Sequence, residues 1–475
     1  MNITTSPPSG TRDFLPADLA RRRHLEGVIR RVYESFGFVP LETPAFEHLS
    51  TLLGKYGDEG DQLLFRLLHR RDKLARALQE PGVGEKDLAD LGLRYDLTVP
   101  LARVIANTKD LPRFFKRYQI QPVWRADRPG KGRYREFWQC DIDITGTTSL
   151  LADVEVCSAV VRVFEELGVR DITIALNHRQ LLRCLIQASG ISPEQEETAL
   201  VAIDKLDKIG LDGVRRELAA RGIAAAAGER LLALISRPPE ASAADRPAVS
   251  SSAGSAAPGV SPAEAAELDR LAGLLTAVPE AAGPLTQLRE LLEIAAGSPA
   301  GPYLRLDATL ARGLGYYTGP IFEIRSPAFS GSLGGGGRYD GLIGMFKGTA
   351  IPAVGFSIGF ERLLLVMEER GLFGRLSCGP DVLFCRFPDA SPADALRAAN
   401  ALRQAGLKVE VYPETPKIGK QFAYAESIQV KLAAILGAKE AQEGRLSIKH
   451  LGTGEQLTLP LREAAARLQE WAKTG

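Results

Sequence analysis

Polar and apolar side chains alternate most regularly between Arg117 and Gly146, and this alternation predicts two β-strands joined by a loop. One face of the first predicted strand carries Gln119, Gln121, Val123, Arg125 and Asp127. The second strand divides into an apolar face, made of Trp138, Cys140, Ile142 and Ile144, and a face made of Phe137, Gln139, Asp141 and Asp143. Because successive side chains of a strand point to opposite faces, the second strand can offer one face to a hydrophobic core and the other to a ligand.

The loop between these strands is long and basic, with Arg128, Lys131, Arg133 and Arg135. A hairpin that only reverses the chain uses about two to five residues with Asn-Gly or Asp-Gly chemistry. A solvated, charged hairpin tip is one interpretation of the loop. The alternative is a binding site. Arg125 at the end of one strand, and the amide and acidic groups of the other, together suit a ligand with anionic and cationic parts.

Helical periodicity appears on both sides of this stretch. Apolar residues predict a helix over about residues 16–36, which Gly37 ends, and a second helix over 151–167. Between the first helix and the central strands, an extended segment holds Pro40 and Pro44 at edge or bend positions.

Changes in composition predict the domain organisation. Residues 1–189 and 299–372 alternate strands and helices and are expected to form one core, whereas 190–298 is alanine-rich, leucine-periodic and free of aromatic residues, as in a helical insertion. Within it, 237–262 is rich in Pro, Ser, Ala and Gly, and we expect a disordered linker because such a segment cannot offset its ordering entropy by burial. Residues 380–475 alternate strand and helix again and predict a small α/β domain.

Composition excludes several classes of protein. The 475 residues carry a net charge of +1, so bulk charge gives no signal for binding a polyanion. The five cysteines include no CxxC pair and the five histidines lack the spacing of zinc ligands, which fits a reducing compartment. The N-terminus lacks a signal-peptide core, and no apolar run approaches the roughly 20 residues of a membrane span. We therefore expect a cytoplasmic protein with no membrane partner.

A short segment around Asp96 and Thr98 has two interpretations. The two side chains would share one face of a short strand, alternating with Tyr95 and Leu97, and a carboxylate beside a hydroxyl suits an ammonium group. Both residue types are also favoured helix caps, and a helix is predicted to begin near Pro100. On the residues alone the cap is the favoured interpretation, and the ammonium site is the alternative.

Several segments carry a family resemblance. RADRPGKGRYREF followed by QCDIDITG resembles motif 2 of the class II aminoacyl-tRNA synthetases, and is similar in particular to histidyl-tRNA synthetases. The helix over 16–36 with the strand holding Pro44 resembles motif 1, and GFSIGFER at 355–362 resembles motif 3. RGLGYYTG at 312–319 and GGRYDGL at 336–342 resemble the two histidine-specific motifs. In the C-terminal domain, IGKQFAYAES and LGTGEQ resemble the anticodon-binding domain of this subclass.

The resemblance implies an α+β catalytic domain with an antiparallel sheet of the class II synthetase type, a helical insertion and a small α/β C-terminal domain. It implies ATP-dependent ligation of L-histidine to its cognate tRNA through histidyl-adenylate, with release of AMP and pyrophosphate. ATP with Mg²⁺ is expected as a substrate complex, with no tightly bound cofactor and no protein-bound metal. The expected partners are tRNA for histidine, L-histidine, ATP and a second copy of the chain in a homodimer.

The resemblance also implies roles for the cationic residues. Arg125 would bind the ATP α-phosphate and the substrate carboxylate, and Arg312 would flank the same phosphate from another side. Arg362 would hold the γ-phosphate, and Arg133 would meet the outer phosphates or the tRNA acceptor end. Phe137 would lie against the adenine. An arginine in these places stays charged and can donate to two oxygens at once.

On the histidine side, the resemblance implies a polar pocket. The substrate ammonium needs acceptors, for which Asp96, Thr98 and Gln139 are suited, and the imidazole needs a donor and an acceptor, for which Asp143 and Tyr317 are suited. The rest of the implied histidine contacts are Arg125, Arg312 and Tyr316. The chain departs from the family pattern at Gly130, where glutamine is usual, and at Gly315, where an acid is usual.

Two of these segments have ordinary interpretations when taken alone. The four glycines before Arg338 could form a loose surface turn instead of allowing close backbone approach to a ligand. The Glu361–Arg362 dipeptide could be a surface ion pair on an amphipathic helix instead of a phosphate site at a helix start. The order and spacing of all the motifs favour the functional interpretations.

Three rival functions follow from the same features. A non-catalytic paralog that regulates ATP phosphoribosyltransferase shares the core, but generally lacks the C-terminal domain and the arginines. A synthetase for proline, threonine or glycine is disfavoured by the tyrosine pair and by GGRYDGL. A generic RNA-binding module has no need of Asp143 on a polar strand face.

Overall fold

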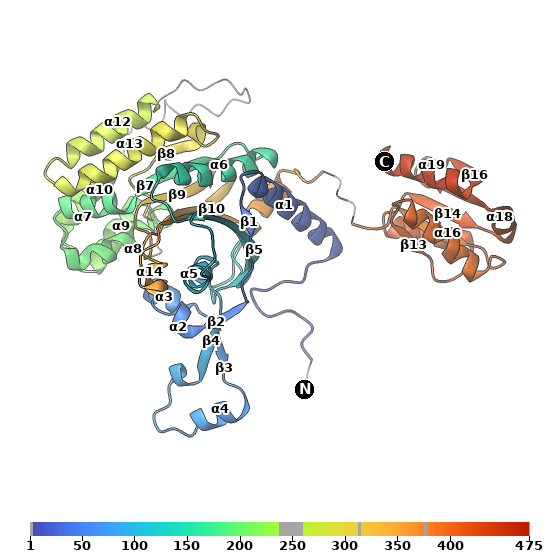
Figure 1. The fold of residues 1–475 in the computed structure, drawn as a ribbon, viewed down its shortest axis with the longest axis horizontal. Coiled ribbons are helices and arrows are strands. Elements are labelled where there is room, and N and C mark those ends of the chain that lie inside the picture. Colours follow the sequence, from blue (N-terminus) through green and yellow to red (C-terminus); the bar gives the residue numbers. More distant parts are fainter. Residues whose placement is uncertain (1–2, 237–259, 312–314, 375, 377, 475) are drawn as a thin grey trace. The chain divides into compact units, whose positions relative to one another are not determined.

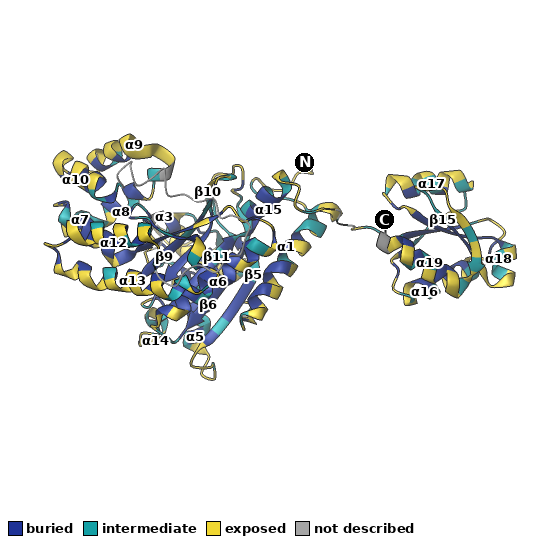
Figure 2. Cartoon of the chain, turned by 90° about the horizontal axis from the view of Figure 1, so that it is seen from above, coloured by how far each residue is buried: buried dark blue, intermediate teal, exposed yellow. Residues whose placement is uncertain are grey.

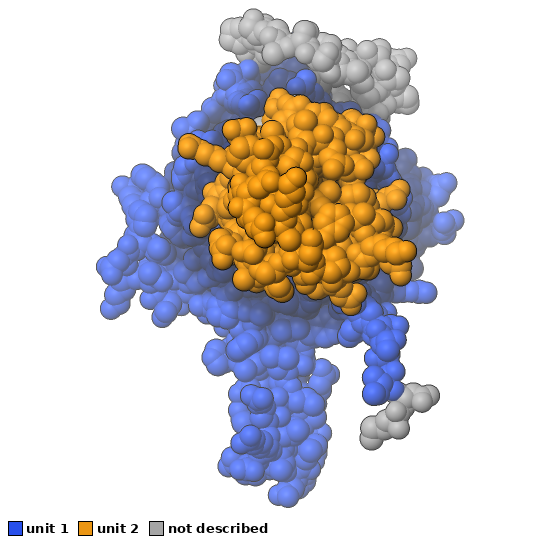
Figure 3. Space-filling view, turned by 90° about the vertical axis from the view of Figure 1, so that its right-hand side faces the viewer, with its two compact units in different colours: residues 1–13, 23–373 blue, residues 14–22, 374–475 orange. Residues whose placement is uncertain are grey.

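The computed structural model describes residues 3–236, 260–311, 315–374, 376 and 378–474. The chain forms two compact units, one made of residues 1–13 and 23–373 and the other of residues 14–22 and 374–475, drawn in blue and orange in Figure 3. Most of the predicted linker, 237–259, and the predicted site residue Arg312 lie outside the described residues.

The first unit is built on an eight-stranded sheet with the order β1-β5-β6-β11-β10-β9-β7-β8. Its strands are β1 (Val39–Pro40), β5 (Phe115–Trp124), β6 (Glu136–Thr145), β7 (Thr173–His178), β8 (Leu304–Leu306), β9 (Pro320–Ser326), β10 (Phe329–Arg338) and β11 (Ala353–Gly359). Neighbours from β5 to β7 pair antiparallel, and only the outer pairs β1–β5 and β7–β8 are parallel. The predicted antiparallel catalytic-type sheet is confirmed.

The two faces of β6 differ as its alternation predicts. Cys140, Ile142 and Ile144 are buried in the main hydrophobic core with α1 (Pro16–Ser35) and α6 (Leu150–Glu166). Figure 1 shows α6 over the outer side of the curved sheet and α5 (Thr98–Asn107) inside its curve. The polar residues of β6 therefore line the inner side, where the chain enters α5.

Two boundaries differ from the sequence prediction. The strand β4 (Ala89–Leu93) ends before Asp96, and Thr98 is the first residue of α5, so the predicted strand through both residues is wrong. The strand β5 ends at Trp124, so Arg125 lies beyond the strand that was predicted to contain it. Asp96 and Arg125 therefore both lie just beyond the end of a strand.

The first unit also contains a second, three-stranded sheet. Its order is β2-β4-β3, with β2 (Phe46–His48) and β3 (Arg66–Leu68) both antiparallel to β4. Four short helices lie between strands of this unit: α2 (Leu49–Leu52), α3 (Gly57–Gln62), α4 (Arg71–Ala77) and α14 (Gly344–Lys347). The helix α15 (Phe360–Glu369) follows β11.

Between β7 and β8 the chain is helical, as the alanine-rich, leucine-periodic composition predicts. The helices are α7 (Arg179–Ala188), α8 (Glu196–Ile203), α9 (Leu206–Ala220), α10 (Ala225–Ile235), α12 (Pro262–Leu274) and α13 (Ala282–Ala296). Each has one apolar stripe in the core, with Leu231 and Leu288 fully buried, and Figure 2 shows their exposed outer faces in yellow.

The second unit is a small α/β domain. Its sheet has the order β13-β12-β14-β15-β16, made of β12 (Val382–Arg386), β13 (Val409–Val411), β14 (Leu432–Leu436), β15 (Arg445–His450) and β16 (Gln456–Pro460). Alternate residues of β12 feed two cores: Phe384 packs with α16 (Pro392–Gln404) and α19 (Leu461–Thr474), and Cys385 packs on the side of α17 (Ile418–Ser427). The predicted alternation of strands and helices is present, with α18 (Ala438–Glu443) between β14 and β15.

No helix in the described part of the chain is long and apolar enough to cross a membrane.

Candidate active site

A cavity of about 390 Å³ lies on the inner side of the large sheet. Its walls come from β6, β10 and β11, from the loop between β5 and β6, and from the starts of α5 and α15. The structure brings together in this cavity all ten predicted site residues that it describes: Asp96, Thr98, Arg125, Arg133, Phe137, Gln139, Asp143, Tyr316, Tyr317 and Arg362. Lys208, from the helical insertion, also lines it.

Arg125 is held by neutral partners at the centre of the cavity wall. Its Nε donates to the Tyr95 carbonyl at 3.0 Å, and its Nη2 donates to Gln139 Oε1 at 3.2 Å. The guanidinium carbon lies 4.2 Å from the centre of the Tyr95 ring and 5.2 Å from that of Phe137. Because no carboxylate is among these partners, the guanidinium keeps its charge available to an anion and is already oriented.

The basic loop closes one side of the cavity through ion pairs. Arg133 Nη2 lies 2.6 Å from Asp127 Oδ1, and its side chain is 54% exposed. Lys131 Nζ lies 2.7 Å from Glu369 Oε1 on α15. Gly130 and Arg133 form an isolated backbone bridge that shapes the tip. The tip is therefore an ordered, cationic edge of the cavity.

Two charged residues at the start of α15, Arg362 and Glu361, have different partners. Arg362 Nη1 donates to the Ser332 carbonyl at 2.6 Å and faces the cavity. Glu361 is buried and pairs with Arg12 at 2.5 Å, and the Arg12 guanidinium lies over the ring of Tyr134 at 3.4 Å. The segment before α1 is thus tied both to the basic loop and to α15.

Three buried carboxyl groups gather at the opposite end of the cavity. Asp143 Oδ2 lies 2.8 Å from Arg117 Nη2, and the Tyr339 hydroxyl donates to Asp143 Oδ1. Asp141 accepts from the Gln139 amide at 3.3 Å. Burial raises the pKa of Asp141 to about 7, with Arg117 opposing this and the charge of Asp143 adding to it.

Asp96 reconciles the two interpretations of its segment. Its Oδ1 accepts from the Val99 backbone N–H in the first turn of α5 and from the Tyr56 hydroxyl, both at 3.1 Å. Its Oδ2 accepts from the Tyr316 hydroxyl at 3.4 Å and the residue lines the cavity. The carboxyl group is therefore both a helix cap and a wall of the site. Burial raises its pKa.

Tyrosine rings pack against one another at this acidic end of the cavity. The ring centres of Tyr316 and Tyr317 lie 5.0 Å apart, and those of Tyr316 and Tyr339 lie 5.9 Å apart. Neither Asp141 nor Tyr339 was predicted as a site residue, although both line the cavity. The signals for them were present: Asp141 lies in register between Gln139 and Asp143, and Tyr339 stands inside the GGRYDGL segment.

Glycines form the floor of the cavity. The run Gly334–Gly337 belongs to β10, so the interpretation as a loose surface turn is wrong. A Cβ on Gly336 would overlap the Gly355 carbonyl, and a Cβ on Gly355 would overlap the Asp143 carboxylate. Bare backbone here leaves the space that the acidic end of the cavity occupies.

Comparison with known proteins agrees with this architecture. The chain matches the family model described as Histidyl-tRNA synthetase over residues 10–363, and the one described as Anticodon binding domain over 387–471. It is 40% identical to the Histidine--tRNA ligase of Phocaeicola vulgatus, over 94% of this chain and 95% of that protein. It is 41% identical to that of Porphyromonas gingivalis, over 96% and 97% of the two chains.

Among solved structures, the crystal structure of histidyl-tRNA synthetase from Nostoc sp. PCC 7120 superposes with a TM-score of 0.75 at 30% identity, covering 99% of this chain and 100% of that one. This chain is therefore similar to these proteins over nearly its whole length. The cavity, with its cationic loop and its buried acidic end, lies within the similar region. By sequence and by fold, the chain belongs to the histidyl-tRNA synthetase family.

Proposed function

We propose that the protein ligates L-histidine to its cognate tRNA in two steps, through histidyl-adenylate, with release of pyrophosphate and then AMP. The observation that carries the proposal is the division of one cavity into a cationic part around Arg125 and Arg362 and a buried acidic part around Asp96 and Asp143. ATP is anionic, and the ammonium and imidazole of histidine need acceptors, so the two parts match the two substrates.

The first step needs alignment and charge neutralisation. The histidine carboxylate is already a nucleophile, so its oxygen attacks the α-phosphorus of ATP without a general base, and pyrophosphate leaves. Arg125, oriented by Tyr95 and Gln139, is proposed to bind both the carboxylate and the α-phosphate. Arg312, outside the described residues, is proposed to neutralise the same phosphate from another side.

The rest of ATP is assigned to the loop and to α15. We propose that Arg362 binds the γ-phosphate, that Arg133 meets the outer phosphates or the tRNA acceptor end, and that Phe137 lies against the adenine. Mg²⁺ is proposed to enter with ATP on its outer phosphates. Arg362 lies at the start of a helix, where backbone N–H groups also favour an anion.

Histidine selection is assigned to the acidic end. Asp96, Thr98 and Gln139 are proposed to accept from the ammonium group, and Asp143, with Tyr317, is proposed to bind the imidazole. Tyr316, which donates to Asp96, completes the pocket. A substrate without the imidazole nitrogens leaves buried polar groups unpaired, which is the physical basis for rejecting it.

The division of labour along the chain is also proposed. Residues 1–189 and 299–372 would be the catalytic core, 190–298 an insertion near the tRNA acceptor arm, and 380–475 the anticodon-binding domain. The last assignment is supported by the anticodon-domain match over 387–471. We propose a cytoplasmic location for the protein.

The decisive measurement is ATP–pyrophosphate exchange with each of the twenty amino acids. We expect exchange with histidine alone. Arg125→Gln is expected to lower kcat/KM for histidine by about 10²–10³-fold, because a preorganised donor at the developing charge is removed. Arg128→Gln, which changes an exposed loop arginine that does not line the cavity, is the matched control and should stay close to the parent.

Each rival predicts another outcome of this measurement. A folded protein that gives no exchange with any amino acid would match the regulatory paralog or an RNA-binding module, and exchange with another amino acid would match a synthetase of different specificity. The anticodon-domain match already disfavours the paralog, since that protein generally lacks the domain.

We also propose that the protein is a homodimer. Val39 on the edge strand β1 and Phe46 on β2 are about half exposed, at 48% and 52%, and they lie in the segment that resembles motif 1. An edge strand with exposed apolar side chains favours association. Sedimentation equilibrium at micromolar concentration should give twice the chain mass, and a single-chain mass would contradict the proposal.

A further inference from the structure

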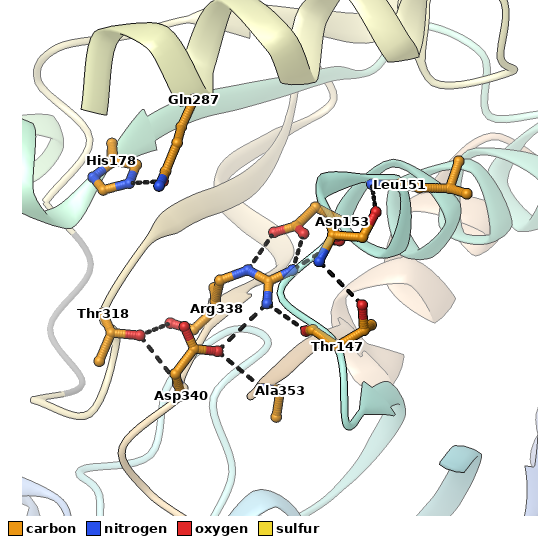
Figure 4. Close-up of polar contacts among 10 residues, drawn as sticks. Thr147, Leu151, Asp153, His178, Gln287, Thr318, Arg338, Asp340 and Ala353 are labelled. Atoms are coloured by element: carbon orange, nitrogen blue, oxygen red, sulfur yellow. Dashed lines mark hydrogen bonds and ion pairs between the residues drawn. The ribbon is translucent and has the colours of Figure 1, made fainter. Parts of the chain in front are cut away.

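A second polar cavity, of about 260 Å³, has Arg338 and Asp340 in its wall. Tyr339, between them in the sequence, lines the first cavity instead. Figure 4 shows the contacts of Arg338 and Asp340. Successive side chains at the end of β10 therefore line two different cavities. The contacts of Arg338 and Asp340 can fix the direction in which the Tyr339 side chain points.

Arg338 is the centre of a buried network. It is 4% exposed, and its Nη2 pairs with the fully buried Asp153 of α6. Its Nη1 donates to the Thr147 carbonyl at 2.8 Å, and its Nη2 to the Ser149 carbonyl at 3.1 Å. One guanidinium thus joins β10 to the connection between β6 and α6, the strand and helix on either side of Thr147.

Thr318 and Asp340 hold the backbone on both sides of Tyr339. The Thr318 N–H donates to the Arg338 carbonyl at 2.8 Å, and the Asp340 N–H donates to Thr318 Oγ1 at 3.0 Å. Asp340 Oδ1 accepts from the Ala353 N–H at 3.0 Å, and the Tyr339 N–H donates to the Ala353 carbonyl at 2.8 Å. The backbone of Tyr339 is therefore fixed from β11 and from the segment that carries Tyr316 and Tyr317.

Tyr339 reaches Asp143 from this fixed backbone. Its hydroxyl donates to Asp143 Oδ1, and its ring is 2% exposed. The Arg338 guanidinium contacts Asp153 and the carbonyls of Thr147 and Ser149. An influence of Arg338 on the acidic end therefore runs through the backbone that leads to Tyr339. We propose that Arg338 is a positioning residue that, with Thr318 and Asp340, keeps the Tyr339 hydroxyl on Asp143 and so sets the affinity for the histidine side chain.

This proposal rests on the proposed function, because it assigns Asp143 to the imidazole. It differs from a purely structural role for the Arg338–Asp153 ion pair in what it predicts. A structural ion pair lowers stability when broken and affects both substrates or neither. A positioning residue changes the KM for histidine and leaves the KM for ATP unchanged, since Arg125 and Arg362 have other partners.

The test is a double-mutant cycle on the full chain, read as histidine-dependent ATP–pyrophosphate exchange. Arg338→Ala and Tyr339→Phe are each expected to raise the KM for histidine by about 10- to 100-fold, the range of one hydrogen bond to a charged group. The KM for ATP should change by less than about twofold in both. In the Tyr339→Phe background, Arg338→Ala should add almost nothing, because the hydroxyl that it positions is already absent.

A second substitution covers the case in which Arg338→Ala does not fold. Arg338→Lys keeps the charge beside Asp153 but cannot supply the donors to both carbonyls, so it should give a smaller rise in the same KM, again lost in the Tyr339→Phe background. Arg270→Ala is the matched control. It breaks a pair with the buried Glu267 on α12, at 2.7 Å, and should lower the melting temperature without altering either KM.

The outcomes separate the possible failures. Parent protein without histidine exchange would overturn the proposed function itself. With exchange present, additive effects of Arg338→Ala and Tyr339→Phe, or equal changes in both KM values, would overturn the positioning role and leave the ion pair structural. A changed KM for histidine in Arg270→Ala would show that loss of stability alone accounts for the effect, and would overturn it too.

Discussion

Asp141 and Asp143 stand two residues apart on one face of β6, yet they have different electrostatic surroundings. Asp143 lies 2.8 Å from Arg117 Nη2, whereas Asp141 accepts from the neutral amide of Gln139. Burial makes a charged carboxylate costly, so the pKa of both groups is raised, and at Asp141 the charge of Asp143 adds to this effect while Arg117 opposes it. This accounts for the pKa of about 7 at Asp141.

That shift predicts how stability depends on pH. The folded-state pKa of Asp141 lies above the ~3.9 of an unfolded chain, so its contribution to stability is complete below pH 4 and is lost as pH rises through 7. Asp141→Asn removes this loss. The parent melting temperature should fall more between pH 5.5 and 8 than that of the variant, with a difference in unfolding free energy of about 2–4 kcal/mol at pH 8.

The measurement is thermal unfolding in the absence of histidine and ATP, because ligands add their own stabilisation. Asp110→Asn, at an exposed position, is the control and should keep the slope of the parent. Parallel curves for parent and Asp141→Asn would show that Asp141 ionises near its ordinary pKa.

At the scale of elements, the site depends on glycines in two adjacent strands, β10 and β11. Gly336 pairs with Phe356, and Gly337 with Gly355. Since a Cβ on Gly355 would overlap the Asp143 carboxylate, the two strands and the acidic end of the cavity are compatible only with glycine at that position.

Two glycine substitutions should therefore have opposite effects. Gly355→Ala is expected to displace Asp143, lowering kcat/KM for histidine by at least about 10²-fold and destabilising the fold by about 1–3 kcal/mol. Gly27→Ala, at an exposed position inside α1 with no atom within 4 Å of the new Cβ, should stabilise by about 0.5–1 kcal/mol without a kinetic effect. Denaturant unfolding and pyrophosphate exchange check both. Unaltered kinetics in Gly355→Ala would refute the steric argument.

Elements could be predicted well from the sequence where polar and apolar side chains recur with the spacing of a strand or a helix. The alternation over Phe137–Ile144 placed β6 and its two faces correctly, and the helical spacing over 16–36 located α1. Glycines carry no such period, so the Gly334–Gly337 part of β10 could not be told from a turn. Around Asp96, a four-residue alternation was too short to distinguish a strand from a chain entering a helix.

The candidate site followed a similar rule. Most cavity-lining residues within motifs were found, although Asp141 and Tyr339 were missed. Tyr56 and Arg117, which contact Asp96 and Asp143, belong to no motif. Their roles depend on where β5 and α3 lie relative to the site, and a single sequence does not contain that information. Tertiary contacts of this kind are set by packing and not by local pattern.

At the scale of the whole molecule, the chain is two units with separate cores. The cavity is lined entirely by residues between 96 and 362, all in the first unit. The second unit has its own hydrophobic clusters around Phe384 and Cys385. From the proposed roles of the two units, we therefore expect a cut between them to separate adenylation from the reading of tRNA.

A chain that ends at residue 373 should keep histidine-dependent pyrophosphate exchange within a few fold of the parent. Its kcat/KM for charging tRNA should fall by about 100-fold or more, because one of two linked binding modules is lost. Circular dichroism should first establish that the shortened chain is folded, since residues 14–22 group with the removed unit. Loss of exchange in a folded, shortened chain would show that the second unit takes part in adenylation.

The pairing of Arg133 with Asp127 has a consequence for how ATP binding responds to salt. Arg125 donates to uncharged oxygens, so a phosphate that reaches it forms a new charge pair. In the proposed complex, a phosphate at Arg133 competes with the Asp127 carboxylate, whose Oδ1 lies 2.6 Å from Arg133 Nη2. Binding at the loop is in this sense an anion exchange, which alters the surrounding ion atmosphere less than a new pairing does. We therefore expect the affinity for ATP to fall less steeply with ionic strength than it would if every arginine around the cavity formed a new charge pair with a phosphate.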